Sequence, residues 1–203
     1  YAQRKSDELQ VTNIDYLHAN ILHLHQMGKK FDIIESAGVL HHMKEPMDGW
    51  RVFVDLLNPG GLMKIGLYSK LARQHITVVR REIASLEIGT SAAEIRNFRE
   101  LSIESEIHDV KQLSRFSDFF SLSEFRDLVF HVQEHQFTIP QIKNCLNELG
   151  LEFCGFGNKD VISNFRALNR NKEEIYDLEL WHQLEERNPS TFAGMYQFWC
   201  QKL

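Results

Sequence analysis

Apolar residues along the chain fall into short runs separated by polar breaks, which is typical of strands alternating with helices. Residues 1–9 read as a helix, and residues 11–17 (VTNIDYL) have the β-branched and aromatic content of a strand. After a polar break, a compact apolar run begins at Phe31 (FDIIESAGVL). Such a run predicts a buried strand of a parallel sheet.

The next stretch of sequence predicts a crossover helix and a second strand. Apolar residues recur through residues 45–57, and the sequence Asn-Pro-Gly-Gly at 58–61 predicts the turn that ends this helix. Residues 61–69 (GLMKIGLYS) predict the following strand. Strand, helix and strand in this order favour an α/β fold with parallel strands.

The character of the sequence changes at residue 70. Charged helical patterns replace strand patterns as far as residue 135, and two capping boxes, Ser91 with Glu94 and Ser121 with Glu124, mark helix starts. We expect three or four helices here. The chain is therefore divided into a core segment, a helical insertion or cap, and a returning core segment, which cover residues 1–69, 70–135 and 136–203.

The returning segment again shows helices followed by strands. Thr138 and Gln141 form a third capping box, and Gly150 occupies the place of a C-terminal glycine cap. The strand LEFCGFG then follows at residues 151–157. A helix over residues 177–187 and a final strand over residues 195–201 (MYQFWCQ) complete the expected elements.

Composition and charge narrow the classes of function. The 203 residues are 43% hydrophobic and carry a net charge of −5. This negative charge argues against extensive electrostatic binding to nucleic acid or to an anionic membrane. Cys145, Cys154 and Cys200 form no CxxC pair, so they indicate neither a disulfide framework nor a thiolate zinc site. No apolar run reaches the roughly 20 residues of a membrane span. A cytoplasmic protein is expected.

Residues 31–69 contain two ordered phrases, GVLHHM and LLNPGGLMKIGLYS. Together they resemble the fourth strand, the following helix and the fifth strand of class I, seven-stranded, S-adenosylmethionine-dependent methyltransferases. Residues 1–22 are similar to the helix and third strand of that family. Residues 137–157 are similar to the helix and sixth strand of that family, and residues 195–202 are similar to its seventh strand. The resemblance implies a partial Rossmann-like methyltransferase sheet that carries a helical insertion.

The same resemblance implies S-adenosylmethionine as cofactor and suggests where it binds. Asn20 and Ile21 occupy the positions whose side chains in the family usually lie against the adenine of the cofactor. The family has an acidic residue at the position of Asn20. The backbone near Ser36 and Ala37 would border the methionine end of the cofactor. The alternative for Asn20 is a polar loop residue that caps the segment from Ile21 onward.

The glycine-rich GxGxG loop of the family is absent from the sequence. The family has this loop and its first two strands upstream of the part that begins here at Tyr1, so we expect a fragment that binds the cofactor poorly by itself. Loss of those strands would expose the edge of the strand that begins at Phe31. Because exposed apolar edges pair with other chains, a homodimer through this edge is expected unless a longer natural chain covers it.

Histidines and a glutamate are the candidate catalytic residues. His41 and His42 follow the strand that begins at Phe31, where ligands bind in open α/β sheets. Either is a candidate general base because imidazole titrates near neutrality, and the alternative is that one of them orients the loop. In the sequence HVQEH at 131–135, a helix would place two histidines on one face. Glu134 and His135 are expected to line the substrate pocket, and a zinc site here is a weaker alternative.

The expected function is methyl transfer from S-adenosylmethionine to an unidentified acceptor. The expected acceptor is a small molecule or a protein, because the negative net charge of the chain disfavours binding to nucleic acid. One alternative is a non-catalytic protein-interaction module on a methyltransferase scaffold. Another is a hydrolytic metalloenzyme that uses His131 and His135.

Overall fold

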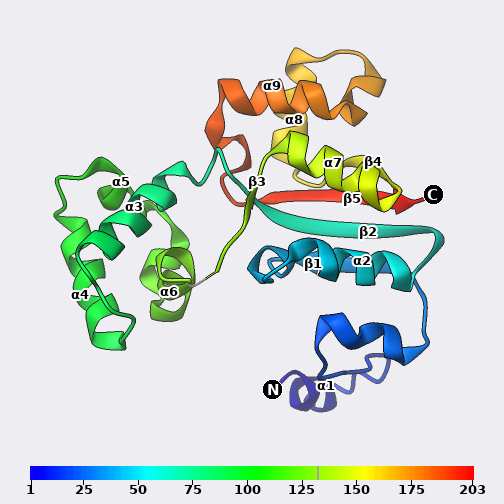
Figure 1. Cartoon of the computed structure of the whole chain (residues 1–203), viewed down its shortest axis with the longest axis horizontal. Coiled ribbons are helices and arrows are strands. Elements are labelled where there is room, and N and C mark those ends of the chain that lie inside the picture. The colour runs from blue at the N-terminus through cyan, green and yellow to red at the C-terminus, as the bar shows by residue number, and fades with distance from the viewer. Residues whose placement is uncertain (132) are drawn as a thin grey trace.

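The structure, a computed structural model, describes residues 1–131 and 133–203 and is a mixed α/β fold (Figure 1). Four strands form the main path of the sheet in the order β1 (Phe31–Ala37), β2 (Leu57–Ser69), β5 (Tyr196–Lys202) and β4 (Leu151–Phe156). The short strand β3 (Gln136–Phe137) also pairs with β2. The predicted α/β fold class with a helical insertion is confirmed by this arrangement.

Strand direction fixes which ends of the strands meet. β1 is parallel to β2, with Ile34 beside Met63, and β5 is antiparallel to both β2 and β4. The carboxyl ends of β1, β2 and β4 therefore share one edge of the sheet, which is also where β5 begins. β1 pairs with β2 alone among the described strands, and Ile33 on it is 60% exposed. The exposed edge expected for β1 is thus present.

The predicted capping residues of the core segments, Thr138, Gln141 and Gly150, mark the two ends of α7. At the start of α7, the Thr138 side chain accepts a hydrogen bond from the Gln141 backbone N–H, and the Gln141 side chain accepts one from the Thr138 backbone N–H. Gly150 ends that helix in the left-handed conformation. Asp177 accepts a hydrogen bond from Glu179 at the start of α9. The helices of these segments are α1 (Ala2–Glu8), α2 (Pro46–Leu56), α7 (Ile139–Leu149), α8 (Lys159–Leu168) and α9 (Leu178–Arg187).

Short 3-10 helices connect these elements. They are η1 (Ile21–Met27), η2 (Leu40–His42), η3 (Leu113–Arg115), η4 (Ser117–Phe120), η5 (Lys172–Tyr176) and η6 (Pro189–Phe192). Of the longer helices, α8 has no counterpart in the sequence prediction. Its start is nevertheless marked in the sequence, because the Asn158 side chain accepts from the backbone of Asp160 and Val161.

The strand predicted for residues 11–17 is wrong: these residues form no regular element. Ile14 and Tyr16 are 48% and 44% exposed, and the Tyr16 hydroxyl lies 2.6 Å from that of Ser6. A strand requires a neighbouring strand to take up its backbone hydrogen bonds, and no described strand lies beside this segment. Strand propensity without such a partner does not produce a strand.

The insertion consists of four α-helices, which lie to one side of the sheet in Figure 1. They are α3 (Gln74–Ser85), α4 (Ala92–Ile103), α5 (His108–Gln112) and α6 (Leu122–Val129). The capping box at Ser91 is complete, whereas Ser121 only accepts from the Glu124 backbone. The insertion has a hydrophobic cluster of its own, centred on buried phenylalanines such as Phe98 and Phe125.

The helix considered for residues 131–135 is wrong. α6 ends at Val129, and the described residues beyond it run without helical structure to β3. Their hydrogen bonds go to the core instead: the backbone N–H of His135 donates to the His41 carbonyl over 2.8 Å. Likewise, residues 58–61 lie within β2 and form its first part, although the sequence predicted a turn.

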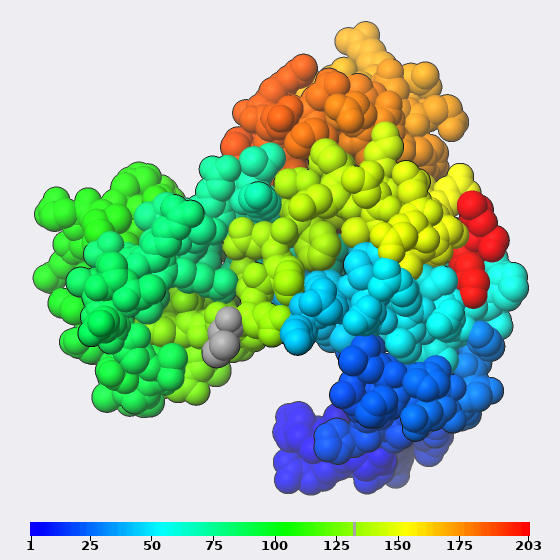
Figure 2. All heavy atoms as spheres, in the orientation of Figure 1, coloured from blue at the N-terminus to red at the C-terminus, as the bar shows by residue number. Residues whose placement is uncertain are grey.

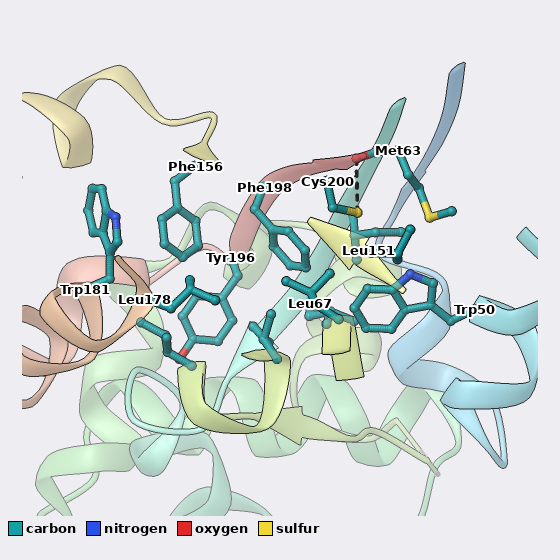
Figure 3. Packing of buried hydrophobic residues seen from close by; sticks show 14 of the residues in the cluster. Trp50, Met63, Leu67, Leu151, Phe156, Leu178, Trp181, Tyr196, Phe198 and Cys200 are labelled. Carbon is teal, nitrogen blue, oxygen red and sulfur yellow. Dashed lines mark hydrogen bonds between the residues drawn. The ribbon is translucent and has the colours of Figure 1, made fainter. Parts of the chain in front are cut away.

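The main core lies between the sheet and its helices, and Figure 3 shows its packing. The Trp181 ring is fully buried and stacks on Phe165 with 3.8 Å between ring centroids. Its indole N–H donates to the Ile175 carbonyl over 2.8 Å, so the one polar atom of this large side chain is satisfied. Among the helices of the described residues, none has the length and apolar character needed to cross a membrane.

Candidate functional site

A cavity of about 520 Å³ lies at the edge of the sheet where the carboxyl ends of β2 and β4 meet the insertion. Tyr68 lines it from the end of β2, Asn158 from the loop after β4, and Met195 from the chain just before β5. Phe116 and Asp118 line it from the insertion. Open α/β sheets bind their ligands at this edge, so the cavity is the candidate ligand-binding pocket.

The two histidines after β1 differ in environment. His41 in η2 is completely buried, and neither ring nitrogen has a hydrogen-bond partner among the described residues. Burial, together with the neighbouring His42, lowers the pKa of His41 to about 4, so its ring is neutral at pH 7. His42 is only partly buried. The His41 ring lies 4.1 Å from the Tyr68 ring, centroid to centroid.

Several contacts fasten the histidine loop to the chain that returns from the insertion. The ring of His42 stacks on that of His131 at 3.9 Å, and its Nδ1 lies 3.1 Å from the Gln133 carbonyl oxygen. The Gln133 side chain donates to the Met43 carbonyl over 3.2 Å. These contacts fix the loop after β1 relative to the returning chain.

Glu134 is the centre of a buried ion network. Its side chain is 0% exposed and accepts two hydrogen bonds from Arg73, each 3.1 Å long, and one from Arg80 over 2.9 Å. Burial alone would raise the pKa of the Glu134 carboxyl, but the charges of Arg73 and Arg80 outweigh burial and lower it. The network joins α3 to the segment that precedes β3.

Tyr68 connects this network to the cavity. The Arg73 guanidinium lies over the Tyr68 ring, 3.8 Å from its centroid, while Tyr68 itself lines the cavity. Burial raises the pKa of the Tyr68 hydroxyl and outweighs the opposing charge of Arg73. The hydroxyl is therefore protonated at neutral pH and available as a donor to a ligand.

A second buried carboxyl, that of Glu185 in α9, lies beneath the end of β2. It accepts hydrogen bonds from the hydroxyls of Ser69 and Tyr196, and the Ser69 oxygen in turn accepts from the Ala72 backbone over 3.0 Å. Burial raises the pKa of the Glu185 carboxyl, although the two hydroxyls oppose this shift. The arrangement holds the turn that leads from β2 into α3.

The predicted catalytic residues lie on two segments that contact each other. His41 and His42 lie on the loop after β1, and Glu134 and His135 lie on the returning chain, whose His135 backbone N–H donates to the His41 carbonyl. None of the four lines the 520 Å³ cavity, and Glu134 instead borders a smaller pocket on α3.

The predicted cofactor residues lie at two places. Asn20 accepts from the Leu22 backbone over 3.0 Å and caps η1, which is the capping role considered as the alternative to adenine binding. Ile21 packs partly buried against the main core. Ser36 and Ala37 end β1, and the Ser36 hydroxyl is buried without a partner among the described residues.

Sequence reasoning missed Tyr68, Arg73, Asp118 and Glu185. The position of Tyr68 at the end of a predicted strand was a usable signal, because parallel strands present ligands at that end. Arg73 and Asp118 lie in helical sequence whose charged residues resemble an ordinary solvated surface. Glu185 was not predictable, since a buried carboxyl inside a helix pattern is recognised only when its hydroxyl partners are placed.

Potential metal ligands do not converge in the described part of the chain: no group of three or more His, Cys, Asp or Glu side chains has the required arrangement. His131 and His135 also lack the helix that would have placed them on one face. The metalloenzyme alternative therefore gains no support from the structure.

Comparison with known proteins agrees with the fold. Residues 1–65 match the family described as "Methyltransferase domain". An uncharacterized protein of Synechococcus sp. is 28% identical over 157 residues, which cover 72% of this chain and 37% of that protein. The structure of PKMT2 from Rickettsia typhi superposes with a TM-score of 0.65 at 15% identity, over 98% of this chain and 40% of that one.

A second structure, PKMT2 from Rickettsia typhi in complex with AdoHcy, gives a TM-score of 0.63, also at 15% identity and over 98% of this chain and 40% of that one. The chain thus spans roughly two fifths of the length of these relatives. It shares the fold of the two PKMT2 structures, and its first 65 residues match the methyltransferase-domain family.

Proposed function

We propose that the protein containing this chain transfers a methyl group from S-adenosylmethionine to an acceptor, a small molecule or a protein, held in the 520 Å³ cavity. The observation that carries the proposal is the cavity's location. It opens at the carboxyl ends of β2 and β4, next to the end of β1, on a class I methyltransferase fold. That edge is where such sheets place their ligands.

The end of β1 has the groups needed to border a cofactor. The buried Ser36 hydroxyl has no partner in the described chain, so it is free to hydrogen-bond with a ligand. Ala37 is exposed beside it. S-adenosylmethionine, when bound, supplies an electrophilic methyl group. The sequence has no GxGxG loop, so Ser36 and Ala37 would form one side of the cofactor site.

We propose that His42 is the group that accepts the proton and that His41 holds His42 in position. His42 is partly exposed, and its Nδ1 faces the Gln133 carbonyl, which favours a proton on Nδ1 and a free lone pair on Nε2. The neutral, buried His41 ring packs between His42 and Tyr68. His41 therefore orients the loop. His42 does not line the cavity but lies beside Tyr68, which does, so His42 would remove the proton from an acceptor that extends past Tyr68 toward the end of β1.

Replacement of His42 tests this assignment. His42→Gln keeps a polar side chain but removes the basic nitrogen, so we expect methyl transfer to fall by roughly 10²-fold or more. Binding of S-adenosylhomocysteine should be unchanged. The assay measures the transfer of tritium from S-adenosylmethionine, labelled in its methyl group, to acceptors in an extract of cells that express the gene.

The matched control is His131→Gln, which removes the histidine stacked on His42. It should reduce methyl transfer far less than His42→Gln does. Equal losses in the two variants, or a parallel loss of S-adenosylhomocysteine binding, would show that His42 is structural.

We further propose that the free edge of β1 forms an interface between two copies of the chain. Phe31 and Ile33 on this edge are 37% and 60% exposed, and unpaired apolar edges associate. Ile33→Lys adds a charge to the edge and should shift residues 1–203 from dimer to monomer in sedimentation. A wild-type chain that sediments as a monomer at high concentration would contradict the proposal.

A further inference from the structure

A second pocket, of about 450 Å³, lies on the face of α3 that is directed toward β3. Thr77, Arg80, Arg81 and Ala84 lie on one face of this helix, because residues three and four apart are neighbours. Lys70, just after β2, and Gln136, in β3, complete the lining together with Glu134. The pocket thus spans the junction between the insertion and the sheet.

The positive charges around this pocket exceed the negative ones. Lys70, Arg80 and Arg81 line it, whereas its single carboxylate, Glu134, is already paired with both Arg73 and Arg80. Neither Lys70 nor Arg81 makes an ion pair with another side chain in the described parts of the chain. The pocket therefore carries an uncompensated positive charge.

Some cations elsewhere on the surface lie beside carboxylates: Arg51 contacts both Asp48 and Glu148, and Lys64 contacts Glu35. Lys70 and Arg81 have no such partner among the described residues. The Arg80 Nε atom adds to the contrast, because it is buried without a hydrogen-bond partner among the described residues. Converging cations with unused donors are the chemistry that recognises phosphoryl and carboxylate groups.

We propose that this pocket binds an oxyanion, the phosphoryl or carboxylate group of a small ligand, between Lys70 and Arg81. The ligand would contact α3 through Arg81 and the end of β2 through Lys70, so its binding ties the insertion to the sheet. The site is separate from the acceptor cavity, since the Arg73–Glu134 pair lies between them, with Arg73 lining the cavity and Glu134 the pocket. The proposal is independent of methyl transfer.

Calorimetric titration of the full gene product with inorganic phosphate, and separately with succinate, tests the site at an ionic strength held constant with sodium chloride. We expect saturable binding of at least one anion, and the double variant Lys70→Gln, Arg81→Gln should weaken it roughly tenfold. Both side chains are exposed, so the variant should fold. Binding of phosphate alone assigns a phosphoryl ligand, and binding of succinate alone assigns a carboxylate.

Arg96→Gln is the matched control, because Arg96 is an exposed arginine on α4 of the same insertion and does not line the pocket. Its affinity for the anion should equal that of the wild type. The proposal is overturned if neither anion binds saturably, or if the double variant and Arg96→Gln bind the anion equally well.

Discussion

Glu134→Gln should lower the free energy of unfolding by about 3 kcal/mol, because it leaves the buried Arg73 and the partly buried Arg80 without their counter-charge. The Glu134 side chain is fully buried between Arg80, which lies on α3, and Arg73, the N-cap residue just before that helix. Gln keeps the size and one acceptor oxygen but not the charge. Urea unfolding at pH 7, followed by circular dichroism, measures the difference.

The pH dependence of this difference identifies its cause. Because the folded-state pKa of Glu134 is lowered below its ordinary value of 4.5, the ionised carboxylate stabilises the fold above that pH. This contribution is lost as the pH falls through the lowered pKa. The gap between wild type and Glu134→Gln should therefore shrink steadily below about pH 4.5.

The control is Glu100→Gln, which removes an exposed carboxylate from α4 of the same insertion. Substitutions of exposed residues usually change stability by less than about 0.5 kcal/mol. If Glu134→Gln were no more destabilising than Glu100→Gln, the network would not hold the insertion to the sheet.

Gly194→Trp should reduce methyl transfer by roughly 10²-fold or more, since displacing a bound reactant by about 1 Å can cost that much. Gly194 lines the acceptor cavity, and a Cβ atom built there meets no heavy atom within 4 Å. Its φ also lies outside the left-handed region, so a side chain is tolerated without backbone strain. The indole would fill space that the acceptor needs.

Gly194→Ala is the control at the same position, and it should keep most of the activity because a methyl group occupies little of the 520 Å³ cavity. Tritium transfer into cell extract and S-adenosylhomocysteine titration are measured on both variants. Loss of transfer with retained binding places the acceptor in the cavity. Full activity of Gly194→Trp would place the acceptor elsewhere.

Local signals in the sequence predicted most of the fold because they act within one turn or one strand. The capping box at Thr138 predicted the start of α7, and the apolar run beginning at Phe31 predicted β1. Residues 11–17 failed because a strand depends on a neighbour that no local pattern supplies. Residues 131–135 failed because their polar groups bond to a loop ninety residues away in the chain, such as Gln133 to Met43.

The site was only partly predictable for the same reason. His41 and His42 follow a strand, and strand ends present ligands, so their place was readable from the sequence. The difference in environment between the two histidines could not be predicted, because it depends on the burial of His41 beside Tyr68. The partners of Glu134, Arg73 and Arg80, lie more than fifty residues away and became visible only once α3 was packed against the returning chain.

The most direct test of the proposed function is calorimetric titration of the full gene product with S-adenosylhomocysteine. A methyltransferase with the arrangement described above should bind it saturably, with heat that fits a single class of site. It should bind much less well to residues 1–203 alone, which lack the GxGxG loop. No binding to the full gene product would contradict the proposed function.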